Sequence, residues 1–236
     1  MKRIWELDAF RGLCVLGMVI VHLVFDLVYL YRLVAWEYPA WFSFMADWGG
    51  VLFLLISGIC VTLGRRNLRR GLLVLLCGFV CTLATWGMYL LNMAGKEIII
   101  YFGVLHCLGC CMLLWPLFRR LPNGPLVALG AAMAVAGVIL RGIDFPTGLW
   151  LMPLGFQPPY FLSSDYFPLL PHLGFFLLGA VLGRTVYRKR ESLLPRVDPE
   201  APALRFLRLC GKHSLWIYLL HQPILSGLVW LLSMVK

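Results

Sequence analysis

Four ionisable side chains lie on one face of the first apolar segment of the chain: Asp8, Arg11, His22 and Asp26. At about 100° per residue of an α-helix, they fall within roughly 60° of one another around the helix axis. Ionisable groups at membrane depth are costly and generally mark a functional site or an ion path. A carboxylate one turn from an imidazole can accept one ring N–H and raise the basicity of the other nitrogen. The pattern therefore predicts that His22 and Asp26 are catalytic.

Arg11 lies near the foot of the same predicted helix, about three turns from His22, and Asp8 lies one turn further away. Their types and spacing fit two roles, and the sequence leaves both open. They either bind the substrate or form an ion pair that fixes the helix to a neighbour.

Three more histidines are predicted within apolar segments, at a depth similar to that of the first: His106, His172 and His221. A single histidine in a membrane helix usually hydrogen-bonds to another helix. Four histidines at a similar depth indicate that at least one of them takes part in catalysis. We expect His106 to be a second catalytic group that stabilises an oxyanion. His172 and His221 are expected to line the same cavity, together with Tyr218.

The second apolar segment carries groups suited to binding an anionic or thioester substrate. Its paired glycines allow a close backbone approach and can expose amide donors to an oxygen atom. The arginines at its inner end suit a phosphorylated nucleotide, although such clusters also anchor membrane topology. The candidate binding residues of this segment are Asp47, Gly50, Ser57, Arg65 and Arg66.

Composition indicates a multi-pass membrane protein. Hydrophobic residues make up 61% of the 236 residues and charged residues only 14%, and the mean hydropathy is +0.84. We therefore predict an all-α fold, a polytopic transmembrane helix bundle that forms a single domain over residues 1–236. Seven apolar segments approach the roughly 20 residues that a bilayer core requires. They are residues 10–31, 43–64, 71–93, 98–118, 125–141, 166–184 and 212–234.

Basic residues cluster on alternate sides of the predicted spans. By the positive-inside rule, this asymmetry places the N-terminus in the cytoplasm and the C-terminus outside, which predicts the cytoplasmic (inner) membrane. The net charge of +10 follows from these clusters, so no nucleic acid is expected as a partner. Residues 185–211 are the only long polar stretch, and we interpret them as a mobile cytoplasmic connector.

All eight cysteines lie in or beside apolar segments, which makes a disulfide framework improbable. His106 and Cys107 with Cys110 and Cys111 resemble a metal cluster. Adjacent helical residues point about 100° apart, however, so these four side chains do not readily form one tetrahedral site. We therefore expect no bound metal.

Four segments carry a family resemblance. Residues 7–12 (Leu-Asp-Ala-Phe-Arg-Gly) resemble the opening of the catalytic domain of heparan-alpha-glucosaminide N-acetyltransferase and its bacterial relatives. The ten residues between Arg11 and His22 match a signature of the wider membrane acyltransferase superfamily, which includes the acyltransferase-3 O-acetylases of cell-envelope sugars. Residues 50–58, 103–109 and 211–221 are similar to later motifs of the family, in the same order.

The resemblance implies an acyltransferase that moves an acetyl group from cytosolic acetyl-CoA to an extracytoplasmic acceptor, a sugar or amino sugar. It makes His22 the imidazole that handles the acyl group, and Arg11 either a donor-side or a structural partner of His22. Two features depart from the family. Larger members have ten or eleven spans, which suggests that this shorter chain works as a homo-oligomer. Residues 31–48 contain no histidine, whereas the glucosaminide enzyme has a key histidine after its first span.

Three other functions stay open from the sequence. Paired histidines at one depth can ligate haem or line a quinone site. His22 and Asp26 could also serve as the proton relay of a small proton-coupled transporter. A non-catalytic factor in envelope assembly is the third. Binding or hydrolysis of acetyl-CoA by the pure protein separates an acyltransferase from all three.

Overall fold

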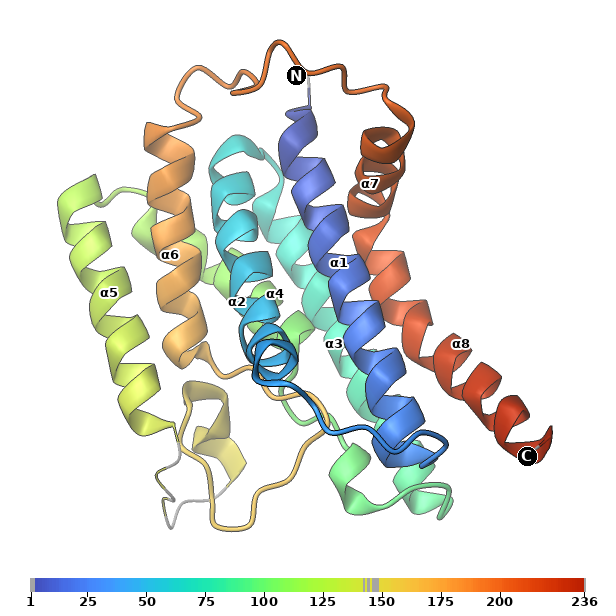
Figure 1. The fold of residues 1–236 in the computed structure, drawn as a ribbon. Coiled ribbons are helices and arrows are strands. Elements are labelled where there is room, and N and C mark those ends of the chain that lie inside the picture. Colours follow the sequence, from blue (N-terminus) through green and yellow to red (C-terminus); the bar gives the residue numbers. More distant parts are fainter. Residues whose placement is uncertain (1–2, 142, 144, 146–148, 236) are drawn as a thin grey trace. The chain divides into compact units, whose positions relative to one another are not determined.

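The computed structural model describes residues 3–141, 143, 145 and 149–235, and these residues are largely helical (Figure 1). The predicted all-α class is confirmed. The chain divides into two compact units. We call residues 1–53 with 189–236 the terminal unit and residues 54–188 the central unit, and each is described by itself.

The terminal unit contains helices from both ends of the chain. Helix α1 (Trp5–Phe25) continues into a π-helical turn, η1 (Asp26–Leu30). Helices α7 (Pro202–Lys212) and α8 (Ser214–Val235) come from the C-terminal end, and both pack against α1 (Figure 1). The first part of α2 (Ala40–Leu63) also belongs to this unit.

Two glycines allow α1 and α7 to cross in backbone contact. A Cβ atom on Gly12 would collide with the carbonyl oxygen of Leu207, and one on Gly211 would collide with that of Asp8. Small residues at a helix crossing permit this close approach. The glycine that follows Arg11 in the N-terminal motif is thus explained by packing against α7.

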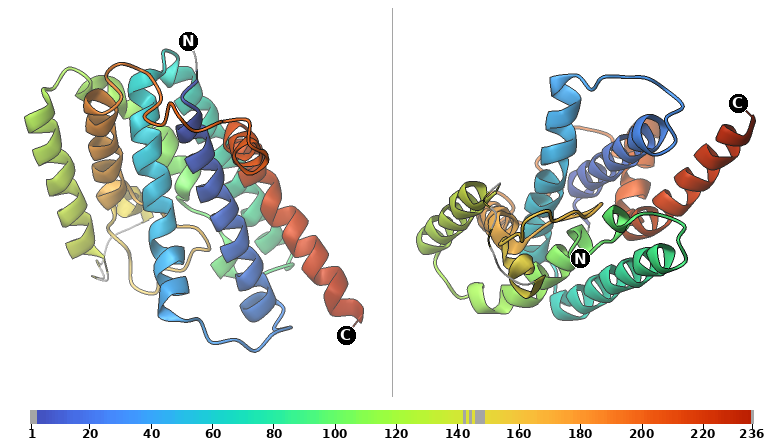
Figure 2. Two further views of the ribbon diagram at one scale, coloured as in Figure 1. Left: turned by 45° about the horizontal axis from the view of Figure 1, so that its top comes forward. Right: turned by 90° about the horizontal axis from the view of Figure 1, so that it is seen from below.

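Among its described residues, the central unit contains the rest of α2 and four further α-helices. These are α3 (Asn67–Leu90), α4 (Val104–Phe118), α5 (Asn123–Leu140) and α6 (Leu169–Thr185). Helix α3 packs against α4, and α5 lies beside α6 in all views (Figures 1 and 2). Short 3₁₀ turns, η2 (Lys96–Ile98) and η3 (Leu149–Leu154), interrupt the connections.

A second glycine-mediated crossing joins α2 to α6. Gly58 faces the carbonyl of Phe176, and Gly179 faces the carbonyl of Leu55, so neither position has room for a Cβ atom. Gly183 contacts the same stretch of α2. The four-residue spacing of Gly179 and Gly183 therefore serves the close packing of α6 against α2.

Within the described residues, five helices are long and apolar enough to cross a membrane. They are Trp5–Leu30, Ala40–Leu63, Asn67–Leu90, Asn123–Leu140 and Ser214–Met234. Two shorter apolar helices, Val104–Phe118 and Leu169–Thr185, match the other two predicted spans. Large apolar side chains such as Leu83 (72% exposed) and Leu90 (67% exposed) cover the outside of α3, as expected of a surface that faces lipid. Seven spans, the orientation and a single domain stay predictions.

The predicted connector at residues 185–211 differs from the structure in its second half. Helix α6 ends at Thr185, and residues 202–211 form most of α7 rather than a mobile loop. Pro202 suits the first turn of a helix because its missing N–H is not needed there. Leucines and arginines then alternate at helical spacing, which gives α7 one apolar and one basic face.

Candidate active site

Two histidines from opposite ends of the chain meet in the terminal unit. The rings of His22 on α1 and His221 on α8 lie edge to face, with their centroids 4.8 Å apart. His221 is buried, and the ring of Tyr218 lies 5.5 Å from it, one turn earlier on α8. The structure thus brings together three of the predicted site residues.

Both imidazoles are fixed by backbone carbonyls of their own helices. Nδ1 of His22 lies 2.9 Å from the carbonyl oxygen of Met18, and Nδ1 of His221 lies 2.6 Å from that of Tyr218. A carbonyl oxygen can only accept a hydrogen bond, so each Nδ1 carries the hydrogen. In the neutral ring, the Nε2 atom then holds the lone pair.

The lone pair of His221 is buried and has no hydrogen-bond partner among the described residues. A buried acceptor without a partner is uncommon in native proteins and is costly in free energy. A substrate hydroxyl or amine could supply the missing donor. This pair of imidazoles therefore has the tautomeric state that a general base requires.

Asp26 lies at the start of η1, four residues beyond His22, and is fully buried. Its carboxylate accepts hydrogen bonds from Nε2 of Gln222 at 3.0 and 3.1 Å and from the hydroxyl of Ser226 at 3.1 Å. The Tyr31 hydroxyl donates to the backbone carbonyl of Ser226 at 3.1 Å. These contacts join the turn that follows α1 to α8.

The expected hydrogen bond from the ring of His22 to Asp26 is replaced by other contacts. The ring N–H points to the backbone of Met18, and the carboxylate is occupied by Gln222 and Ser226. The sequence analysis missed these two residues of α8. An amide and a hydroxyl four residues apart, directly after His221, lie on one helix face and are the signal that could have revealed them.

Asp8 and Arg11 form the ion pair that was one of their two predicted alternatives. Arg11 Nη1 pairs with Asp8 Oδ1 at 3.2 Å and also donates to the carbonyl of Gly211 on α7 at 3.4 Å. Eleven residues at 1.5 Å of rise separate Arg11 from His22, about 16 Å along the helix. Arg11 is thus too far away to touch the imidazole.

In the central unit, His106 uses both ring nitrogens within the protein. Nδ1 accepts the backbone N–H of Gly103 at 3.2 Å, so the hydrogen is on Nε2, which lies 3.3 Å from the hydroxyl oxygen of Thr82. That hydroxyl in turn donates to the carbonyl of Ile100 at 2.6 Å. Asp165 accepts the N–H of Val104 at 3.1 Å. The side chains of His106 and Asp165 thus cap the start of α4.

The remaining predicted residues are dispersed. His172 is buried in α6, and its Nδ1 lies 2.7 Å from the carbonyl oxygen of Pro168. Ser57 lies within α2, whereas Arg65 and Arg66 are exposed between α2 and α3. Gly50 lies in the part of α2 that belongs to the terminal unit.

The side chain of Asp47 lies outside the described part of the structure. The predicted convergence of His106 and His172 with His22 and His221 stays a prediction, since the two pairs belong to different units. Among the residues that the structure describes, no group of three or more His, Cys, Asp or Glu side chains is placed to hold a metal ion.

Long apolar helices and buried ionisable side chains define the class: a helical membrane protein with a polar site among its helices. Residues 3–223 match the family described as heparan-alpha-glucosaminide N-acetyltransferase, catalytic, and the chain belongs to this family. The predicted resemblance is confirmed, and the family implies a transferase. No curated protein and no solved structure matches the chain.

Proposed function

We propose that the protein is an acetyltransferase of the cytoplasmic membrane, which moves an acetyl group from cytosolic acetyl-CoA to the amine or hydroxyl group of an extracytoplasmic sugar. Membership of the family supports acetyl transfer. The observation that carries the proposal is the contact between His22 and His221, each with its Nδ1 hydrogen held by a backbone carbonyl. With the hydrogen on Nδ1, each neutral ring carries its basic lone pair on Nε2.

Transfer from a thioester requires a base and removal of the acceptor proton. We propose that Nε2 of His22 takes this proton while the acceptor nitrogen or oxygen attacks the carbonyl carbon of the thioester. The tetrahedral intermediate collapses, the C–S bond breaks, and the CoA sulfur leaves with the electron pair and receives the proton. Transfer through an acetyl-imidazole at the same Nε2 also fits this geometry, and both routes require His22.

His221 supports His22 in this proposal. Its ring holds the first imidazole by an edge-to-face contact, and its unpartnered Nε2 offers a second lone pair for the acceptor proton. The contact also argues against haem ligation by this pair, because two axial imidazoles are separated by the iron atom. The haem alternative therefore receives no support from these two residues.

For Asp26 and His106 we propose roles other than the catalytic ones that the sequence analysis predicted. We propose that Asp26, Gln222 and Ser226 position α8 against α1, so that His221 stays beside His22. His106 has a hydrogen-bond partner for each ring nitrogen, so we propose that it holds the start of α4. The expected homo-oligomer stays a prediction.

The test uses purified full-length protein with acetyl-CoA and two acceptors, an amino sugar and the matching sugar with only hydroxyl groups. Mass spectrometry of the sugar identifies the acetylated position. We expect product from at least one acceptor and none from His22→Ala, whereas His213→Ala should behave like the wild type because His213 is exposed and outside the site. Full activity of His22→Ala, or no product from the wild-type protein, contradicts the proposal.

A further inference from the structure

A pocket lies at the other end of the terminal unit, between the start of α1 and helix α7. Its volume is about 240 Å³. Both flanking helices approach closely here because Gly12 and Gly211 let their backbones touch. The residues that line the pocket are Arg3, Trp5, Asp8, Glu200, Arg205, Arg208, Leu209 and Lys212.

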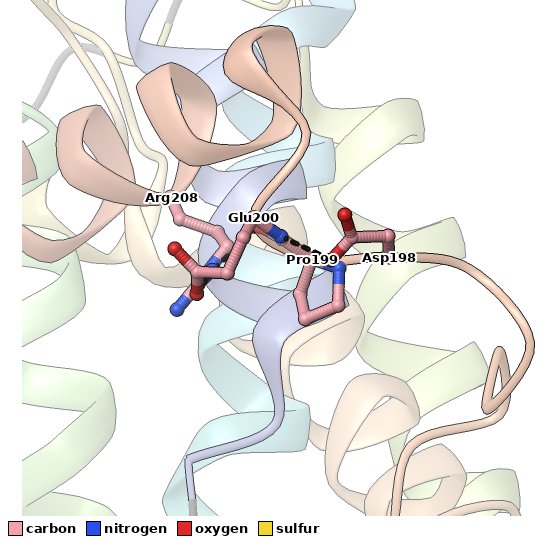
Figure 3. A network of polar contacts seen from close by, with 4 residues as sticks. All are labelled: Asp198, Pro199, Glu200 and Arg208. Carbon is pink, nitrogen blue, oxygen red and sulfur yellow. Dashed lines mark hydrogen bonds and ion pairs between the residues drawn. The ribbon is translucent and has the colours of Figure 1, made fainter.

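The two acidic residues of this pocket are already neutralised. Asp8 pairs with Arg11 at 3.2 Å, and Glu200 pairs with Arg208 at 2.5 Å. Arg208 also donates to the carbonyl of Pro199 at 2.6 Å, which holds its guanidinium group in place (Figure 3). A ligand in the pocket would therefore meet little repulsion from these carboxylates.

Three cationic side chains remain for a ligand. Arg3, Arg205 and Lys212 line the pocket, and their side chains form no hydrogen bond or ion pair with the described residues. Three cations around one concave site repel one another unless an anion lies between them. Guanidinium and ammonium groups in this arrangement are suited to phosphate oxygens, because their N–H groups form charge-assisted hydrogen bonds.

The connector that precedes α7 is held by hydrogen bonds beside the basic residues of the pocket. The N–H of Glu200 donates to the carboxylate of Asp198 at 2.9 Å, which closes the turn before α7 (Figure 3). The N–H of Leu193 donates to the Glu6 carboxylate at 2.7 Å, so the connector is also attached to α1. The pocket is therefore built by specific contacts on both sides.

We propose that this pocket binds a phosphate group of a phosphorylated ligand, with Arg3, Arg205 and Lys212 as its cationic contacts. Pockets for whole drug-sized ligands measure about 300–1,000 Å³, so this smaller one fits a phosphate-bearing part of a larger molecule. The phosphate comes either from CoA, in which case the inference rests on the proposed function, or from the headgroup of an anionic lipid. This location differs from the exposed Arg65 and Arg66, which the sequence analysis favoured for a nucleotide.

The first experiment measures binding without acetyl transfer. Adenosine 3′,5′-bisphosphate, which carries the 3′-phosphate of CoA and the first of its two 5′-phosphates, is added to the purified full-length protein, and the thermal unfolding midpoint is recorded. A ligand that binds only the folded state raises this midpoint. We expect a rise for the wild type and for Arg196→Gln, a connector arginine outside the pocket, and no rise for the double variant Arg205→Gln, Lys212→Gln.

The second experiment compares two acetyl donors. For the double variant we expect the KM for acetyl-CoA to rise roughly tenfold or more, since each lost contact involves a charged donor. The KM for acetyl-pantetheine, which lacks the nucleotide, and the kcat should stay at the wild-type values. If wild-type protein transfers no acetyl group at all, the proposed function fails, while the binding result still decides the phosphate site.

A third arm identifies a lipid as the source. If the phosphate belongs to a lipid, phosphatidylglycerol added to protein in neutral lipid raises the unfolding midpoint of the wild type but not of the double variant. The KM for acetyl-CoA is then the same for the wild type and the double variant. This outcome supports the phosphate site and assigns it to a lipid. If the double variant matches Arg196→Gln with the bisphosphate, with acetyl-CoA and with the lipid, the inference is overturned.

Discussion

The imidazole of His22 meets that of His221 edge to face, with 4.8 Å between the ring centroids. The two residues are about 200 positions apart in the chain, and the contact exists because α8 packs against α1. Each ring is held by the carbonyl of a residue three or four positions earlier in its own helix. The basic nitrogens are thus prepared by local helix geometry, and the pairing depends on the packing of the two helices.

Replacement of His221 tests whether the pair works as a unit. We expect His221→Ala to lower kcat by about 10²-fold, within the range for loss of a general acid–base group. In His22→Ala the loss should be at least as large, and the double variant should be little worse than His22→Ala, because residues that act as a unit are not additive. If the fall in kcat of the double variant equals the product of the two single-variant falls, the two histidines act independently.

The Asp26 cluster should affect stability more than chemistry. Ser226→Ala removes a partly buried hydrogen bond to the fully buried Asp26 carboxylate, and we expect the free energy of unfolding to fall by about 1–3 kcal/mol. Ser233→Ala on the same helix removes only an exposed bond to a backbone carbonyl and serves as the control. Thermal unfolding in detergent compares the two variants.

A larger change at the same cluster separates positioning from catalysis. Asp26→Ala leaves the donors of Gln222 and Ser226 without their acceptor, so stability should fall further than in Ser226→Ala. We expect kcat to fall much less than in His22→Ala, because both imidazoles remain. Complete loss of turnover in an Asp26→Ala protein of normal stability would instead place Asp26 in the catalytic step.

The crossing of α1 and α7 predicts a strong difference between two glycines of α1. In Gly12→Ala the new methyl group would collide with the carbonyl of Leu207, and we expect a loss of about 1–3 kcal/mol in stability. At Gly17 a Cβ atom meets nothing within 4 Å, so Gly17→Ala should be neutral or slightly stabilising. Equal unfolding midpoints for the two variants would contradict this crossing.

Replacement of His106 tests whether this histidine stabilises the start of α4 rather than taking part in catalysis. His106→Ala leaves the N–H of Gly103 without its acceptor and the hydroxyl of Thr82 without its donor. We expect a lower unfolding midpoint and a nearly normal kcat for the folded fraction. Thr82→Val should show the same pattern in milder form, and Thr185→Val, at an exposed helix end, should show none. A stable but inactive His106→Ala protein would restore the predicted catalytic role.

The sequence was sufficient to predict the long apolar helices and the face of α1 that carries His22 and Asp26. Apolar segments of bilayer length are visible in composition, and the angular spacing places His22 and Asp26 on one face of α1. The family followed from short motifs in a conserved order along the chain, and it is confirmed over residues 3–223. These features depend on local periodicity, which a single sequence contains.

Partners that meet only in the folded chain could not be derived in the same way. Gln222 and Ser226 contact Asp26 across nearly the whole sequence, and no local pattern indicates which helix packs against α1. The ring hydrogens of His22 and His106 depend on which backbone group lies next to each nitrogen. Helix α7 was missed because its charges favoured a loop, although its alternation of leucine and arginine is typical of an amphipathic helix.

The most direct test of the central claim is the rate of CoA release from acetyl-CoA by purified protein, measured with a thiol reagent in the presence of an amino sugar. The account predicts acceptor-dependent release by the wild type and a loss of about 10²-fold or more in His22→Ala, with an unchanged unfolding midpoint. Equal rates of release by the wild-type and His22→Ala proteins would contradict it.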